Sequence, residues 1–294
     1  MEVFTGSGVA IVTPFKEDRE TIDYDCFERL VEFQLTNGTD AIVVTGTTGE
    51  ASTLDDKEHL EAIRFVIKAV NGRVPVIAGV GSNDTRHGRA LSIEAEKAGA
   101  DALLHVTPYY NKTSQRGLVE HFAAIARAVA IPIILYSVPS RTQMSIAPET
   151  LAELAAYENI VGLKDANGDL SYTTEVRRQV GDRFDLWTGN DDIVLPFLAL
   201  GGKGVISVVA NITPKETSDM CARFFAGDVA GALSIQLKYK ELIDAMFIEP
   251  NPIPVKAALK MMGMDSGALR LPLVSAAPAT EARLALAMRR AGLI

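Results

Sequence analysis

The sequence predicts a (β/α)8 barrel, or TIM barrel, with a C-terminal helical appendage. Short apolar runs rich in β-branched residues alternate with longer segments of 3.6-residue periodicity, and the alternation persists to residue 226. The length of 294 residues, of which 48% are hydrophobic, suits one barrel of about 250 residues with additional helices. We therefore expect a catalytic barrel over residues 1–226 and a helical region over residues 227–294.

Each predicted strand is a short apolar run, and the eight runs cover residues 8–14, 41–46, 74–80, 102–107, 131–138, 160–166, 185–189 and 204–210. The segments that follow them have the apolar spacing of amphipathic helices and cover residues 24–36, 55–70, 84–98, 114–129, 148–156, 171–180, 191–200 and 214–226. Right-handed crossovers would place each helix outside its strand and close the barrel. Three further helices are expected over residues 228–247, 252–263 and 277–292, with Pro250, Pro252 and Pro254 at the first joint.

The composition excludes several classes of partner. The net charge is −8, and no run of Lys and Arg is present, so binding to nucleic acid or to an anionic membrane is not expected. An anionic substrate would have to be held by local cations and backbone amides. Cys26 and Cys221 lie far apart in helical patterns, which is typical of buried thiols in a reduced cytosolic protein. The sequence shows no signal peptide and no run of about 18 apolar residues, so a cytoplasmic location is expected.

Reactive side chains of such barrels project from the C-terminal ends of the strands. The sixth predicted strand places Lys164 after four apolar residues. Burial disfavours the ammonium, so this side chain is expected to have a lowered pKa and to supply the neutral amine that attacks a carbonyl. Strand alternation predicts that it faces the same side as Gly162 and Ile160. The residues alone also allow a lysine that pairs with Asp165 at the mouth of a loop.

The other lysines are weaker Schiff-base candidates. Lys203 precedes the eighth strand and is expected at the opposite face of the barrel, Lys112 lies in a polar loop, and Lys256 lies on a terminal helix.

Two other strand ends carry polar groups that suit the same chemistry. The second strand ends in Thr47 and Thr48 between two glycines, a turn whose amides could receive a carboxylate. The fifth strand ends with Tyr136, which could transfer a proton, and is followed by Arg141, which could clamp a carboxylate. The alternatives are a helix-capping glycine turn, an aromatic core residue and a solvated arginine.

The remaining polar residues argue against two other mechanisms. The four histidines are dispersed without metal-ligand spacing, so no metal is expected. Asp191 and Asp192 occupy the loop after the seventh strand, where phosphate-binding barrels place donors, so an unphosphorylated substrate is favoured.

Five motifs resemble the dihydrodipicolinate synthase family, the 4-hydroxy-tetrahydrodipicolinate synthases. They are Gly46-Thr47-Thr48-Gly49-Glu50, Tyr109-Tyr110-Asn111, Leu135-Tyr136-Ser137-Val138-Pro139-Ser140-Arg141-Thr142, Gly162-Leu163-Lys164-Asp165 and Glu249-Pro250-Asn251-Pro252-Ile253-Pro254. The first and fourth suit the wider pyruvate-dependent aldolase superfamily, whereas Tyr110, Arg141 with its flanking residues and the last motif resemble the synthases themselves. The resemblance extends from Phe4 to the C-terminal Ala-Gly-Leu-Ile.

The resemblance implies a lyase of lysine and diaminopimelate biosynthesis that condenses pyruvate with L-aspartate 4-semialdehyde. It requires no cofactor, because the reaction runs through a covalent imine with pyruvate. By resemblance, Lys164 forms this Schiff base and Tyr136 donates and accepts protons. Thr47 connects Tyr136 to Tyr110, which reaches in from a neighbouring subunit.

The resemblance also implies substrate contacts and an assembly. Thr48 and Ile206 would contact pyruvate, and Arg141 would bind the carboxylate of the semialdehyde near the entrance. The expected assembly is the homotetramer, a dimer of dimers, that is common in the family.

Some members of the family are inhibited by lysine in a cleft between subunits, and the matching positions here are possible allosteric residues. The chain keeps His59, Asn83 and Tyr109, but it has Ala51 and Asp56 where sensitive relatives carry a serine and a histidine. His87 stands where those relatives carry a glutamate. An imidazole cannot replace the negative charge that would pair with the inhibitor's ammonium, so weak or absent inhibition is expected. The alternative is that Asp56 faces the same cleft and compensates in part.

Two other functions remain open from the sequence. One is a pyruvate-dependent sugar-acid lyase of the N-acetylneuraminate or 2-keto-3-deoxy-sugar type, against which Arg141 argues. The other is a non-catalytic barrel that serves as a ligand sensor.

Overall fold

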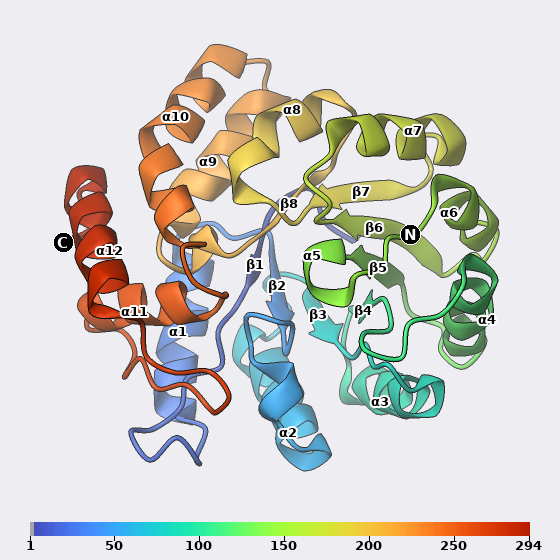
Figure 1. Ribbon diagram of the computed structural model, residues 1–294, viewed down its shortest axis with the longest axis horizontal. Helices are drawn as coiled ribbons and strands as arrows, with labels where there is room; N and C mark the ends of the chain where they lie inside the picture. Colours follow the sequence, from blue (N-terminus) through green and yellow to red (C-terminus); the bar gives the residue numbers. More distant parts are fainter. Residues whose placement is uncertain (1–2) are drawn as a thin grey trace.

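The computed structural model describes residues 3–294 and shows a closed barrel of eight parallel strands in the order β1 to β8 (Figure 1). This confirms the predicted TIM barrel. The strands are β1 (Gly6–Ala10), β2 (Ala41–Val44), β3 (Val76–Gly79), β4 (Ala102–Val106), β5 (Ile133–Ser137), β6 (Ile160–Asp165), β7 (Asp185–Thr188) and β8 (Gly204–Ser207). Met1 and Glu2, with which the predicted barrel region begins, lie outside the described residues.

Helices follow every strand and surround the barrel. They are α1 (Tyr24–Thr36), α2 (Asp56–Val70), α3 (Thr85–Ala98), α4 (Gln115–Ala126), α5 (Pro139–Thr142), α6 (Pro148–Leu154), α7 (Leu170–Val180), α8 (Val194–Ala199) and α9 (Pro214–Phe225). Short 3-10 turns cover Ala51–Thr53, Asp191–Ile193 and Val209–Asn211. The sequence analysis missed α5, whose four residues are too few to show a helical period.

Side-chain caps explain where several helices begin. Asp55 accepts a hydrogen bond from the amide of Glu58, whose side chain returns to the amide of Asp55, so α2 starts with a capping box. Asp23, Asp84 and Ser114 cap α1, α3 and α4 with one side-chain acceptor each.

The first strand is shorter than predicted at its C-terminal end. The pairing of β1 ends at Ala10, and the amide of Val12 donates instead to the side chain of Asn211 at 3.2 Å. Residues 11–14 are buried, which explains why their apolar pattern resembled that of a strand.

Two apolar layers flank the strands. One fills the barrel interior and includes Val43, Ile77, Ile134, Trp187 and Ile206, and the other lies between the strands and the helices. The sequence prediction that Ile160 shares the inner face with Lys164 is wrong. Ile160 belongs to the outer layer, because a register shift between Ile133 and Ile134 breaks the alternation on β6.

Three helices follow the barrel: α10 (Val229–Ala245), α11 (Ile253–Met261) and α12 (Pro278–Ala291). Figure 1 shows α11 and α12 outside the barrel beside α1, with α10 against α9. The division into two regions at residue 226 stays a prediction.

Of the helices within residues 3–294, none combines the length and apolarity needed to cross a membrane.

Candidate active site

Lys164 lies near the C-terminal end of β6 and is 6% exposed. Burial lowers the pKa of its amine to about 8 from 10.5; the Asp191 carboxylate acts against this shift, and the Arg141 guanidinium adds to it. At pH 7 about one amine in ten is then neutral, about 300 times the fraction of an ordinary lysine. The side chain is therefore suited to nucleophilic attack on a carbonyl.

Two glycines lie close to Lys164, and Gly189 is the one that makes room for its side chain. A Cβ at Gly189 would lie 3.0 Å from the Cε of Lys164, so the loop after β7 packs directly on the lysine stem. A Cβ at Gly162 would lie 2.3 Å from the carbonyl oxygen of Asp185 and 2.7 Å from the ring of Trp187. The space below the lysine is thus filled by the buried Trp187, which stacks on Phe4.

Tyr136 faces Lys164 across the β5–β6 pair. The two residues are register partners, and Nζ of Lys164 lies 4.4 Å from the centre of the Tyr136 ring. Burial raises the pKa of the phenol, and the charge of Arg141 and a side-chain hydrogen bond with Thr47 act against this rise. The phenol therefore keeps its proton at neutral pH and can donate it, with Thr47 as its partner.

The loop that presents Thr47 and Thr48 has an unusual backbone. Thr45 and Glu50, which flank it, both adopt the left-handed conformation, with φ of 52° and 54°. Gly79 on β3 permits the close approach of this loop, since a Cβ there would lie 2.5 Å from the carbonyl oxygen of Thr45. Strained backbone of this kind is characteristic of functional sites and needs support from the surrounding structure.

Arg141 lies on α5, directly after β5, and its side chain reaches the C-terminal region. Its Nη2 donates to the carbonyl oxygen of Asn251 at 2.8 Å. The side chain amide of Asn251 donates in turn to Oγ1 of Thr48 at 2.9 Å. The joint between α10 and α11 thus contacts two of the residues predicted to bind substrate.

A cavity of about 520 Å³ opens beside three of the candidate residues. Its lining includes Thr47, Tyr136 and Arg141, together with His59, His87 and Tyr109. This volume accommodates small ligands, and the one guanidinium among the residues just named would attract a carboxylate.

The structure brings Lys164, Tyr136, Thr47 and Arg141 together at one end of the barrel. Thr48 is buried against Asn251, and Ile206 packs in the interior layer that also holds Tyr136. These positions agree with the arrangement expected from the sequence, but the roles of the residues stay predictions.

Tyr110 differs from the other predicted catalytic residues. Its side chain is 95% exposed, and its φ of 69° is unusual for an aromatic residue. The neighbouring Tyr109 lines the cavity, whereas Tyr110 is not among its lining residues. Within one subunit, Tyr110 is not part of the site.

Of the possible allosteric residues, His59, His87 and Tyr109 line the same cavity. Nε2 of His87 is 2.8 Å from a carboxylate oxygen of Asp56, so an imidazole hydrogen-bonded to Asp56 stands where lysine-sensitive relatives are expected to carry a glutamate. His59 bonds to the carbonyl oxygen of Gly79 at 2.8 Å. Asn83 donates to the carbonyl oxygen of Tyr109 at 3.1 Å.

Sequence reasoning missed three residues beside the site. Asp191 is buried, and its carboxylate accepts hydrogen bonds from the amides of Val208 and Val209 at 3.0 and 3.2 Å. Asn251 contacts Thr48, and Lys256 is completely buried with its amine 2.8 Å from Glu50. The sequence analysis named Asp191 on the loop after the seventh strand, Lys256 on a terminal helix and Asn251 in the last motif, but none of these signals indicated the contacts seen here.

Comparisons with known proteins show which family the chain resembles. The family model described as the dihydrodipicolinate synthetase family matches residues 3–290. A 4-hydroxy-tetrahydrodipicolinate synthase of Caldicellulosiruptor saccharolyticus is 55% identical over 94% of this chain and 92% of its own length. That of Lachnoclostridium phytofermentans is 50% identical over the whole of both chains.

A solved structure shows the same fold. It is a chloride-inhibited dihydrodipicolinate synthase from Acinetobacter baumannii complexed with pyruvate, which has a TM-score of 0.97 and 44% identity and covers 99% of each chain. The match of the family model over nearly the whole chain and the high identity of the relatives lead to one conclusion. This chain belongs to the dihydrodipicolinate synthetase family.

Proposed function

We propose that this enzyme is a lyase that condenses pyruvate with L-aspartate 4-semialdehyde to 4-hydroxy-tetrahydrodipicolinate, a step of lysine and diaminopimelate biosynthesis. The observation that carries the proposal is the buried Lys164, whose pKa is lowered to about 8 and whose amine faces the Tyr136 ring. The names of the relatives favour this reaction over a sugar-acid lyase and over a non-catalytic sensor.

The first steps need only pyruvate. The neutral amine of Lys164 attacks the carbonyl carbon of pyruvate, and loss of water gives a protonated imine. The imine withdraws electrons, so the methyl group loses a proton and an enamine forms. Tyr136, whose pKa is raised by burial, supplies and receives protons in these steps through Thr47.

The second substrate then enters near Arg141. Its carboxylate pairs with the guanidinium, which is held by the carbonyl oxygen of Asn251. The enamine carbon attacks the aldehyde carbon, and the resulting oxyanion takes up a proton. The amino group of the semialdehyde then attacks the imine carbon, which closes the ring and releases the amine of Lys164. Thr48 and Ile206 are the proposed contacts of pyruvate.

We also infer a homotetramer, arranged as a dimer of dimers. Tyr110 supports a first interface, because an aromatic side chain that is 95% exposed in a left-handed backbone suits insertion into a neighbouring subunit. Val229, Leu233 and Leu237 support a second, since they form an exposed apolar row on α10 with spacing i, i+4, i+8. Sedimentation of the wild type beside Leu237→Glu would test the second interface.

The buried thiols of Cys26 and Cys221 support a reducing, cytoplasmic location.

The decisive experiment for the reaction combines trapping with an assay. Pyruvate and borohydride should attach irreversibly to Lys164, and peptide mass spectrometry should locate the adduct there. Purified enzyme should turn over pyruvate with aspartate semialdehyde and should not cleave N-acetylneuraminate or a 2-keto-3-deoxy-sugar acid. An adduct on another lysine, or preference for a sugar acid, would contradict the proposal.

A further inference from the structure

The loop that carries Thr47 and Thr48 is tied to the C-terminal region by three contacts. Two of them involve Glu50, whose carboxylate has no exposed surface. One of its oxygens accepts from the amine of Lys256 on α11 at 2.8 Å, and the other accepts from the backbone amide of Arg270 at 3.1 Å. The third is the bond from Asn251 to Thr48.

Lys256 is an unusual side chain for a terminal helix. It has no exposed surface, and its amine also donates to the carbonyl oxygen of Thr13 at 2.8 Å and lies 4.3 Å from the centre of the Phe15 ring. The hydroxyl of Thr13 donates to the carbonyl oxygen of Gly49 at 2.7 Å. The lysine therefore holds the loop both directly at Glu50 and through the segment that supports Gly49.

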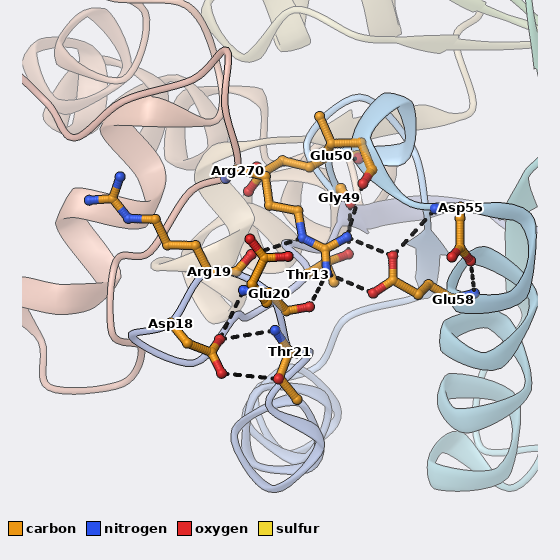
Figure 2. A network of polar contacts seen from close by, with 11 residues as sticks. Thr13, Asp18, Arg19, Glu20, Thr21, Gly49, Glu50, Asp55, Glu58 and Arg270 are labelled. Carbon is orange, nitrogen blue, oxygen red and sulfur yellow. Dashed lines mark hydrogen bonds and ion pairs between the residues drawn. The ribbon is translucent and has the colours of Figure 1, made fainter.

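Arg270 reinforces the same arrangement from the exposed side. Figure 2 shows its guanidinium between the segment of residues 18–21 and Glu58, with which it forms two hydrogen bonds of 2.6 and 2.7 Å. Its guanidinium carbon lies 4.4 Å from the centre of the Phe15 ring. The C-terminal region thus holds the segment between β1 and α1 and the start of α2, which lie on either side of the loop.

The backbone of the loop explains why it needs these contacts. Thr45 and Glu50 adopt left-handed conformations that non-glycine residues rarely hold without support. A buried carboxylate is costly when it loses its cation, so Glu50 stays in position only while Lys256 is present. Displacement of Glu50 would move Thr48, which lies two residues earlier in the loop. It would also move Thr47, the hydrogen-bond partner of Tyr136.

We propose that Lys256 is a positioning residue of the active site, which holds the Thr47–Thr48 loop in its reactive geometry through the buried ion pair with Glu50. The proposal rests on the condensation proposed above. It assigns to α11 a role in the binding of pyruvate and in proton transfer, although Lys256 itself contacts neither substrate. A misplacement of about 1 Å can reduce catalysis by about 100-fold, so the effect on kinetics is expected to be large.

Lys256→Met tests the proposal, because methionine keeps an unbranched apolar stem and removes the charge. We expect the KM for pyruvate to rise about tenfold or more, and kcat to fall, when rates are referred to folded protein. Lys260→Met is the matched control, since Lys260 lies on the same helix and is exposed. It should stay within twofold of the wild type in both constants.

A double variant separates positioning from stability. Glu50→Gln in the Lys256→Met protein removes the unpaired charge, so the thermal midpoint should recover while the KM for pyruvate stays raised, because α11 no longer holds the loop. Recovery of the KM together with the midpoint would overturn the proposal. Wild-type constants in folded Lys256→Met would also overturn it.

Two further measurements complete the test. Should Lys256→Met fail to fold, the double variant with Glu50→Gln, which holds no unpaired buried charge, carries the same expectation of a raised KM for pyruvate. Hydrogen exchange of residues 45–54 without substrate should be faster in whichever variant is folded than in the Lys260→Met control. This readout does not depend on the reaction, so a failure of the proposed activity and a failure of the positioning role can be told apart.

Discussion

The Lys164→Met variant should be more stable than the wild-type protein, although it should form no adduct with pyruvate. Burial opposes the ammonium form and lowers the pKa of Lys164 from 10.5 to about 8. Each pKa unit corresponds to about 1.36 kcal/mol, so the buried amine costs the folded protein up to about 3 kcal/mol at pH 7. Methionine fills the same space without this cost.

The pH dependence makes the prediction specific. Below pH 8 the amine is protonated in both states, and the full cost is present. Between pH 8 and 10.5 the unfolded chain holds a proton that the folded protein has lost, so the stability of the wild type rises with pH. The difference between variant and wild type should therefore fall from about 3 kcal/mol at pH 7 to about 1 kcal/mol at pH 10.

Urea unfolding at these two pH values, at one protomer concentration, measures the difference. Lys260→Met provides the control for the loss of a lysine, because Lys260 is exposed. The reasoning would be refuted by a variant less stable than the wild type at pH 7, or by a difference that is the same at both pH values.

Four other perturbations test separate parts of the site. Arg141→Ala should reduce turnover of the semialdehyde by about tenfold or more while pyruvate adduct formation on the lysine persists, because only the second substrate needs the guanidinium; equal losses in trapping and turnover would indicate a structural role. Tyr110→Phe should lower kcat with the oligomer intact in sedimentation, and full turnover would exclude this hydroxyl from proton transfer. His105, whose pKa is lowered to about 3 by burial, should destabilise the protein as pH falls below 6.5. Urea unfolding should show a loss of about 2 kcal/mol between pH 6.5 and 5 that His105→Gln lacks. L-Lysine should inhibit weakly, because the carboxylate of Asp56 is already paired with His87 at 2.8 Å. Strong inhibition at submillimolar lysine in the condensation assay would contradict this.

The sequence by itself determined the barrel and predicted which candidate residues lie at one end of it. Its alternation of strands and helices predicted eight parallel strands, and the C-terminal ends of parallel strands in a barrel all meet at one end. Lys164, Tyr136, Thr47 and Arg141 could therefore be grouped from their positions in the chain alone. Local apolar neighbours also predicted the burial of Lys164, because a strand end in a closed barrel is covered on both faces.

Only the tertiary structure decided what surrounds these residues. The orientation of Ile160 depends on a register shift that no alternating pattern reveals. The pairing of Lys256 with Glu50 joins residues 206 positions apart. Such a contact depends on how α11 packs against the barrel, and a lysine on a helix looks the same in sequence whether it faces solvent or a buried carboxylate. Local patterns determine which elements form, whereas long-range packing decides which side chains meet.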